Sequence, residues 1–241
     1  MEIGWRLFSA DKRGGVKMKK LFLPLILIII VCVPATAQDF KIIGGPVFST
    51  FSDPWPFLPL LSPSSGNLNP FQSHYTAAFG GFGVEIPLSK KLLIEVDGLY
   101  KEDGNHYQLD YGPTSSYLYD NNLKELSIPV LFKTRFLKSP WPYFLVGGNF
   151  SFILSHQFNL YYRATASDNF EKIAAEDFHN STARNNLGLV FGLGFEIPHS
   201  KGKMSVEARY ELGLKNLLKN YSAYSEDIKT RQLMLIFGLK I

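Results

Sequence analysis

In several segments of this chain, apolar residues alternate with glycine or charged residues at every second position. The clearest case is segment 187–197, where Leu187, Leu189 and Phe191 begin a row of six apolar side chains. Mostly glycine occupies the positions between them, and Glu196 ends that second row. Because successive strand side chains point to opposite faces of a sheet, the pattern predicts a strand with one apolar face and one small or charged face.

Eight segments have this strand character: approximately 39–50, 74–87, 91–101, 123–135, 142–155, 185–197, 203–213 and 230–241. Three connections are short: 87–90, 137–140 and 198–202. Four are long and rich in Tyr, Asn, Asp, Ser and Pro: 51–73, 102–122, 156–184 and 214–229. An even strand count with short periplasmic turns and long outer loops is typical of outer-membrane barrels. The sequence therefore predicts an all-β, antiparallel, eight-stranded up-and-down transmembrane β-barrel with four long outer loops. If segment 156–184 folds back across the sheet, ten strands become possible.

The apolar face is expected to meet lipid rather than to fill the barrel. Phe144, Phe150 and Phe152 lie on that face of one strand, and Phe237 lies on it in the last. The interior of an eight-stranded barrel is only just wide enough for side chains, so these rows would overfill it. A closed barrel also satisfies every backbone polar group within hydrocarbon.

The opposite face places charged side chains in the lumen. Since an unpaired buried charge costs several kcal/mol, we expect these side chains to form a structural network of ion pairs. A proton or solute path is the functional alternative. The residues predicted to share this network are Glu85, Glu95, Asp97, Glu125, Lys133, Glu196, Glu207, Arg209, Glu211 and Lys240.

The first 37 residues read as an export signal. Leu21–Val33 is an apolar run of 13 residues that follows Lys17, Lys19 and Lys20. The run is shorter than the roughly 20 residues needed to span a bilayer as a helix. Small residues at 35–37 then predict cleavage before Gln38, and Met18 is the expected start of translation. The barrel domain is thus expected over 38–241.

Removing that signal changes the charge. Residues 1–37 hold six of the 25 basic and two of the 21 acidic residues, so 38–241 carry 19 of each. A chain of zero net charge has no compositional support for binding nucleic acid. The only cysteine, Cys32, lies within the signal, and no cofactor or metal motif is found in the rest of the sequence.

The outer loops are the candidate binding surfaces. Segment 102–122 contains Tyr107, Tyr111, Tyr117 and Tyr119, and tyrosine is favoured where proteins recognise partners. The alternative is an aromatic girdle at the membrane interface, with strands that project beyond it.

The one suggestive pair for catalysis is His179 and Ser181, which could act on a lipid ester. Its spacing is common, and no orienting acid can be assigned from the sequence.

Several strands also resemble the PorT-like outer-membrane β-barrel family. Segment 126–133 (LSIPVLFK) is similar to its EIPLLLK strand and 142–148 (PYFLVGG) to its PYLFAGP strand. Segments 187–196 and 206–210 resemble its GLVFGLGAE and LEARY segments. The resemblance spans about residues 40–241. It implies an eight-stranded barrel of a Gram-negative outer membrane and a link to machinery that exports and attaches surface proteins.

From these observations we expect a non-enzymatic outer-membrane barrel in contact with outer-membrane lipid. It would bind an envelope or secretion-complex protein through its loops or its periplasmic rim. A structural barrel without a specific partner is one alternative, and a lipid-modifying enzyme that uses His179 and Ser181 is another.

Overall fold

The computed structural model describes residues 39–52, 71–111, 115–136, 141–165, 167–200, 202–219 and 227–241. The expected signal over 1–37 lies outside these residues, as do the side chain of Tyr111 and most of the first outer loop. The described part contains no helix that is long and apolar enough to cross a membrane.

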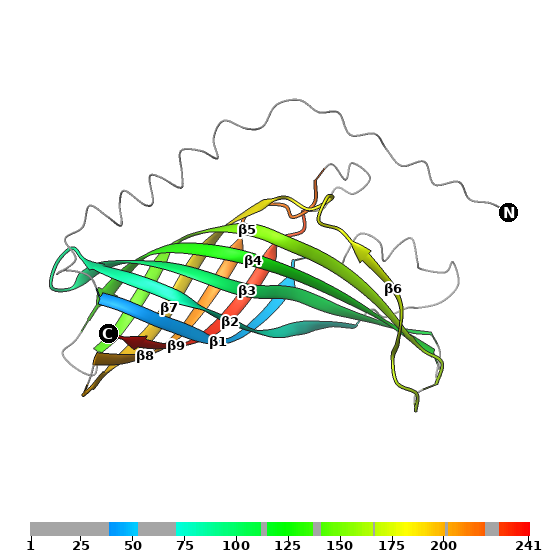
Figure 1. Cartoon of the computed structure of the whole chain (residues 1–241), viewed down its shortest axis with the longest axis horizontal. Helices are drawn as coiled ribbons and strands as arrows, with labels where there is room; N and C mark the ends of the chain where they lie inside the picture. Colours follow the sequence, from blue (N-terminus) through cyan, green and yellow to red (C-terminus); the bar gives the residue numbers. More distant parts are fainter. Residues whose placement is uncertain are drawn as a thin grey trace, which may run out of the picture. The chain divides into compact units, whose positions relative to one another are not determined.

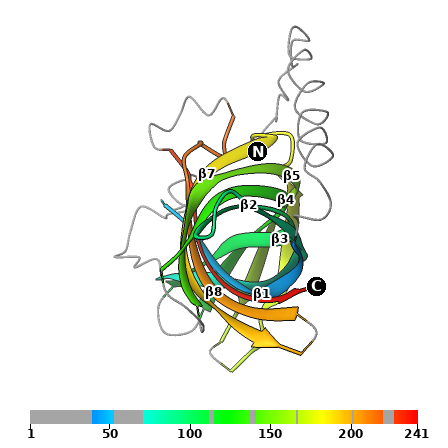
Figure 2. The ribbon, with the colours of Figure 1, turned by 90° about the vertical axis from the view of Figure 1, so that its left-hand side faces the viewer.

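Within the described residues the chain forms a single antiparallel sheet. Its strands are β1 (Asp39–Phe51), β2 (Phe71–Pro87), β3 (Leu92–Tyr111), β4 (Ser115–Arg135), β5 (Trp141–Arg163), β6 (Glu171–Asp177), β7 (Asn185–His199), β8 (Gly202–Gly213) and β9 (Thr230–Lys240). The order is β4-β3-β2-β1-β9-β8-β7-β5-β6, and β4 also pairs with β5. Eight strands therefore close into a ring, and β6 pairs with residues 157–162 of β5, beyond the part of β5 that pairs with β7 (Figures 1 and 2). The predicted eight-stranded barrel is confirmed.

The alternation read from the sequence sets which side chains face outward. On β7 the six apolar residues of the row from Leu187 to Ile197 are 40–58% exposed, and those between them are buried up to Glu196. The same outward apolar rows cover 92–100 on β3 and 126–134 on β4. Rows of nine to eleven residues match the length of a tilted strand across a bilayer. We call this outward surface the apolar band.

Four strands, β2 to β5, continue past the apolar band, and the start of β2 at Phe71 pairs with Gln108 on β3. The sequence predicts that the third strand ends at residue 101 and that 102–122 form a loop. In the structure β3 runs to Tyr111 and β4 begins at Ser115. The loop assignment was wrong, because paired strands beyond the membrane can carry polar side chains on their outward face. At about 3.4 Å per residue, 102–111 reach roughly 30 Å along the strand. Figure 1 shows β3, β4 and β5 passing the ends of the other strands.

β6 also belongs to this extension. It pairs with β5 from Gln157↔Asp177 to Tyr162↔Glu171. Segment 156–184 therefore both lengthens β5 and folds back along it, which adds a ninth strand rather than the two that a ten-stranded sheet requires. We call the outer lobe the parts 102–111, 115–124 and 155–163 of β3–β5, together with β6 and segments 178–184 and 214–219.

A β-bulge at Leu154 gives the outer lobe its own core. Glu125 pairs with Ile153 but Lys124 pairs with Ser155, so Leu154 has no partner in the β4–β5 register. The extra residue reverses which side chains of β5 point inward. Even-numbered residues face inward beyond it and join a cluster under the lobe. The buried members of that cluster are Phe51, Tyr107, Leu109, Tyr119, Leu123, Ile153, Phe158, Leu217, Leu218 and Ile228.

Candidate functional site: the lumen network and the outer lobe

The charged residues predicted for the lumen all lie inside the barrel. Each of the ten is at most 2% exposed. Strand alternation brings them there from β2, β3, β4, β7, β8 and β9. Together with further residues that were not predicted from the sequence, they form three layers along the barrel.

The periplasmic layer joins two carboxylates to three cations. The Nζ atom of Lys133 lies 2.7 Å from Glu85 Oε1 and 2.6 Å from Glu196 Oε1. Lys240 forms ion pairs with the same two glutamates. Arg135 Nη2 adds a contact of 3.0 Å to Glu196. Each carboxylate is thus shared by several cations, which offsets the cost of removing it from water.

The central layer is built around Arg209. Its guanidinium donates to Asp97 Oδ2 at 2.6 Å, to Glu207 Oε2 at 2.7 Å from Nε, and to Glu95. Lys41 Nζ lies 2.9 Å from Glu207 Oε1 and also pairs with Glu95. Three carboxylates therefore meet two cations within one cross-section of the barrel.

The outer layer is centred on Lys101. Its Nζ atom lies 2.7 Å from Glu211 and 2.9 Å from Glu125. It also donates to the Gln232 side chain, whose amide nitrogen donates to Asp103 at 2.6 Å. Lys41 and Lys101 were missed from the sequence, although both share the parity of the inward-facing residues of their strands.

The tyrosines predicted to form a binding surface are divided by the structure. Tyr107 and Tyr119 are 1% and 4% exposed and lie in the core of the outer lobe. Tyr117 is half-buried, and its ring centroid lies 4.9 Å from that of Tyr162 on β5. Surface recognition by this hairpin therefore depends on residues other than the two buried tyrosines.

The outward face of the lobe is polar and internally paired. Lys124 Nζ lies 3.2 Å from Glu102, and Asn122 donates to the hydroxyl of Tyr75 at 2.6 Å. Burial and the nearby Glu102 carboxylate raise the pKa of Tyr75 to about 12. Near the hairpin tip, Asp110 accepts hydrogen bonds from Gln108 at 2.9 Å and from Ser116 at 2.6 Å.

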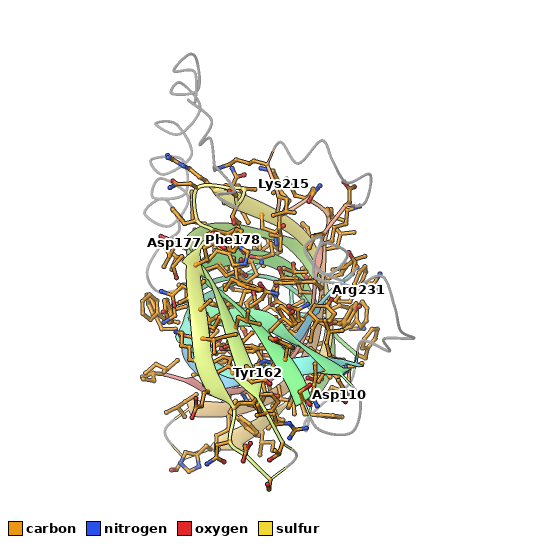
Figure 3. The ribbon with its side chains drawn as sticks, turned by 90° about the vertical axis from the view of Figure 1, so that its right-hand side faces the viewer. Asp110, Tyr162, Asp177, Phe178, Lys215 and Arg231 are labelled. Carbon is orange, nitrogen blue, oxygen red and sulfur yellow. The ribbon has the colours of Figure 1, made fainter. Side chains whose placement is uncertain are left out.

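The hydrogen bond from Gln108 and, to a smaller extent, that from Ser116 lower the pKa of Asp110. Its carboxylate therefore stays ionised at neutral pH. Figure 3 views this outer end of the chain and labels Asp110 and Tyr162.

β6 is the most exposed strand of the described residues. All seven of its residues are exposed, including Ile173 at 53%. It is the last strand in the sheet order, so its second edge pairs with no described strand. Three of its residues are acidic and one is Lys172. Charges on an edge strand limit unspecific pairing with other chains.

Segment 178–184 tucks inward between β6 and β7. Phe178 packs against Phe158, with ring centroids 5.7 Å apart. His156 Nδ1 lies 2.6 Å from the hydroxyl of Thr182, and Thr182 forms a β-bridge with Leu218. Burial lowers the pKa of His156 to about 4, so the ring is neutral at pH 7.

The His179–Ser181 pair lies in a turn of this segment. The backbone N–H of His179 donates to Asp177 Oδ1 at 2.9 Å, and that of Ser181 donates to the carbonyl of Phe178 at 3.0 Å. Within the described residues, no hydrogen bond joins the imidazole of His179 to the hydroxyl of Ser181. The contacts are those of a turn rather than of a nucleophile and its base.

A closed antiparallel barrel with an outward apolar band and a charged interior is the structure of an outer-membrane barrel protein. The chain belongs to the outer membrane protein beta-barrel domain family, whose model matches residues 37–219. It is therefore a protein of the cell outer membrane. No curated protein matches the chain.

Similar solved structures are distant. Ail, the attachment invasion locus protein of Yersinia pestis, is 14% identical to this chain with a TM-score of 0.38, and the match covers 85% of this chain and 99% of the Ail chain. The outer membrane protein OprG of Pseudomonas aeruginosa is 14% identical with a TM-score of 0.43, covering 85% and 96%. The outer membrane protease OmpT of Escherichia coli is 12% identical with a TM-score of 0.37, covering 84% and 95%. Likenesses at this level carry no argument about function.

Proposed function

We propose that this protein is a non-enzymatic outer-membrane barrel that binds an envelope or secretion-complex protein through its outer lobe. The observation that carries the proposal is the continuation of β3, β4 and β5 about ten residues past the apolar band, with the fully exposed β6 along their side. An extension of this length is not needed to cross the membrane. It presents an ordered polar surface outside the membrane instead.

The filled lumen supports the same proposal. Three layers of ion pairs occupy the interior of a barrel whose eight strands leave room only for side chains. We infer that the lumen is a structural plug and does not conduct solutes. Function is then expected on the outer surfaces of the barrel.

Of the two rims, the outer one offers the larger surface. On the periplasmic side, β2 and β3 are joined by 88–91, and β7 and β8 by 200–201. Both connections are too short to form a surface comparable with the outer lobe. The resemblance to the PorT-like family suggests that the partner belongs to machinery for export or attachment of surface proteins.

The chemistry of β6 indicates what kind of partner segment fits. The edge of β6 that pairs with no described strand offers backbone donors and acceptors, and a partner strand could add to it. Glu171, Glu176 and Asp177 favour a segment that carries basic side chains. The binding is then expected to weaken as the salt concentration rises.

Affinity purification with a charge-reversed lobe tests this proposal. Glu171 and Glu176 are both exposed, so replacing them should leave the fold intact. The variant E171K/E176K therefore reports on the charge of the β6 surface alone. The matched control K90E/K91E reverses two exposed charges in the β2–β3 turn on the periplasmic side. We expect a protein that co-purifies with the wild type to be lost from E171K/E176K and retained by the control. Equal recovery with both variants would refute binding through β6, and loss from the control alone would move the site to the periplasmic rim.

A further inference from the structure

The outer ends of β7, β8 and β9 carry a group of cationic side chains outside the barrel. Arg184 directly precedes β7, Lys215 follows β8, and Lys229 and Arg231 lie at the start of β9. The register places these ends side by side, because the N–H of Leu214 donates to the carbonyl of Leu187 and Leu212 pairs with Arg231. We call Arg184, Lys215, Lys229 and Arg231 the cationic rim. Figure 3 labels Lys215 and Arg231 at this end of the barrel.

Acidic side chains of the described residues balance little of this charge. Lys229 pairs with the exposed Asp227 at 3.1 Å. Lys215 donates to the neutral amide oxygen of Asn185, which leaves its charge uncompensated. Within the described part of the chain, the guanidinium groups of Arg184 and Arg231 have no carboxylate within ion-pair distance. Counted over the residues that the structure describes, the rim therefore holds four positive charges against the one negative charge of Asp227.

On the side of the barrel formed by β3 and β4, the charges just beyond the apolar band are balanced. There the first charged residues beyond the apolar band, Glu102 and Lys124, neutralise each other at 3.2 Å. Residues 38–241 as a whole have 19 basic and 19 acidic residues. The excess of positive charge over β7–β9 is thus a local feature and does not follow from the composition.

The height of the rim relative to the lipid is set by the apolar band. Leu233 and Leu235 are 43% and 38% exposed on β9, and Arg231 is the next outward-facing residue. On β7, Leu187 is 48% exposed and Arg184 lies one residue beyond the start of the strand. Cations directly above lipid-facing leucines lie where the headgroups of the outer leaflet begin.

We propose that the cationic rim binds the phosphate groups of an anionic outer-leaflet lipid, with its acyl chains along the apolar rows of β7–β9. Three neighbouring strands span about 10 Å at roughly 4.8 Å per strand, which suits a headgroup that carries two phosphates. Arginine can donate to a phosphate through two parallel N–H groups, and lysine adds a point charge. This lipid site shares Arg184 and Lys215 with the outer lobe but uses no residue of β6, so the charge-reversed β6 variant and the rim variants test the two proposals separately.

Binding to lipid A, which carries two phosphates, tests the site. The full mature protein in detergent is titrated with lipid A and with its enzymatically dephosphorylated form, and inorganic phosphate serves as a competitor. The test variant is R184Q/R231Q, and the control K90Q/K91Q removes two exposed charges at the periplasmic end. A second variant, R184K/R231K, keeps the charge, and the heat-modifiable gel shift of each protein checks that the barrel is folded.

Each basic residue near an anionic lipid surface is worth a factor of about five in affinity, so R184Q/R231Q is expected to bind lipid A about 30-fold more weakly. The control and R184K/R231K are expected to stay within about threefold of the wild type, and dephosphorylated lipid is expected to bind as weakly as the test variant does. Equal affinity of R184Q/R231Q and wild type would overturn the proposal. So would equal binding of dephosphorylated lipid, an equal loss in the control, or full displacement by millimolar inorganic phosphate, which would indicate a site for a free anion.

Discussion

Replacing Arg209 by methionine tests whether the lumen network holds the barrel together. Methionine keeps much of the length of the side chain and removes its charge. In the wild type, Arg209 donates to Glu95, Asp97 and Glu207, and only Lys41 shares contacts with two of these three. The variant R209M leaves these three buried carboxylates to Lys41 and to the more distant Lys133, whose Nζ atom lies 3.7 Å from Glu95, and neither lysine forms an ion pair with Asp97.

The size of the effect follows from this count. Removing one partner of a buried ion pair costs about 3–5 kcal/mol, because a charge remains buried without compensation. Lys124 provides the comparison, since its pair with Glu102 is 40% and 27% exposed and such pairs contribute about 0–1 kcal/mol. We therefore expect R209M to lower the free energy of unfolding by at least 3 kcal/mol and K124M by less than 1 kcal/mol.

Urea unfolding of both variants in the same lipid, followed by the gel shift of the folded barrel, measures this difference. The double variant R209M/D97N removes one of the stranded carboxylates and is expected to recover part of the loss. If R209M and K124M cost the same, the ion pairs of the lumen do not contribute to stability as argued. An absence of recovery in the double variant would show that lost packing, rather than charge, causes the effect.

Three further outcomes are expected. Gly81→Ala places a Cβ 2.0 Å from the carbonyl oxygen of Gly98 and should cost about 2 kcal/mol in urea unfolding. Gly80→Ala meets nothing within 4 Å and should be neutral, and equal costs of the two variants would contradict the close approach of β2 and β3 at Gly81. Because burial lowers the pKa of His156 from 6.5 to about 4, the opened lobe takes up a proton that the closed lobe excludes. The closed form therefore keeps its full stability above pH 6.5 and loses about 2 kcal/mol by pH 5. The protection factors of the amides in 178–184, which correct for the intrinsic exchange rate at each pH, should fall on acidification in the wild type and not in H156Q. In planar bilayers the purified protein should add no steady ion current, and a stable conductance would show that the lumen is open.

The barrel and its orientation follow from strand alternation. The row that begins at Leu187 identified the lipid face, and residues of opposite parity such as Glu196 and Arg209 were placed in the lumen. Period-two alternation is sufficient because a closed barrel has only two faces, and the short and long connections then set which end is periplasmic.

The outer lobe could not be predicted in the same way. Residues 102–122 are polar on the outward face and read as a loop, although cross-strand pairing extends them as strands. The bulge at Leu154 depends on the register between β4 and β5, so the inward position of His156 is invisible to a local pattern. The buried positions of Tyr107 and Tyr119 likewise depend on segments distant in the sequence that pack against them.

Photo-crosslinking in living cells tests most directly that the outer lobe is the functional surface. A photoreactive amino acid replaces Ile173, which is 53% exposed on β6, and in a second strain replaces Lys90 in the periplasmic turn. We expect a discrete crosslinked protein from position 173 and none of the same mass from position 90. Crosslinks from position 90 alone, or none from position 173 while the protein is folded in the outer membrane, would contradict the account.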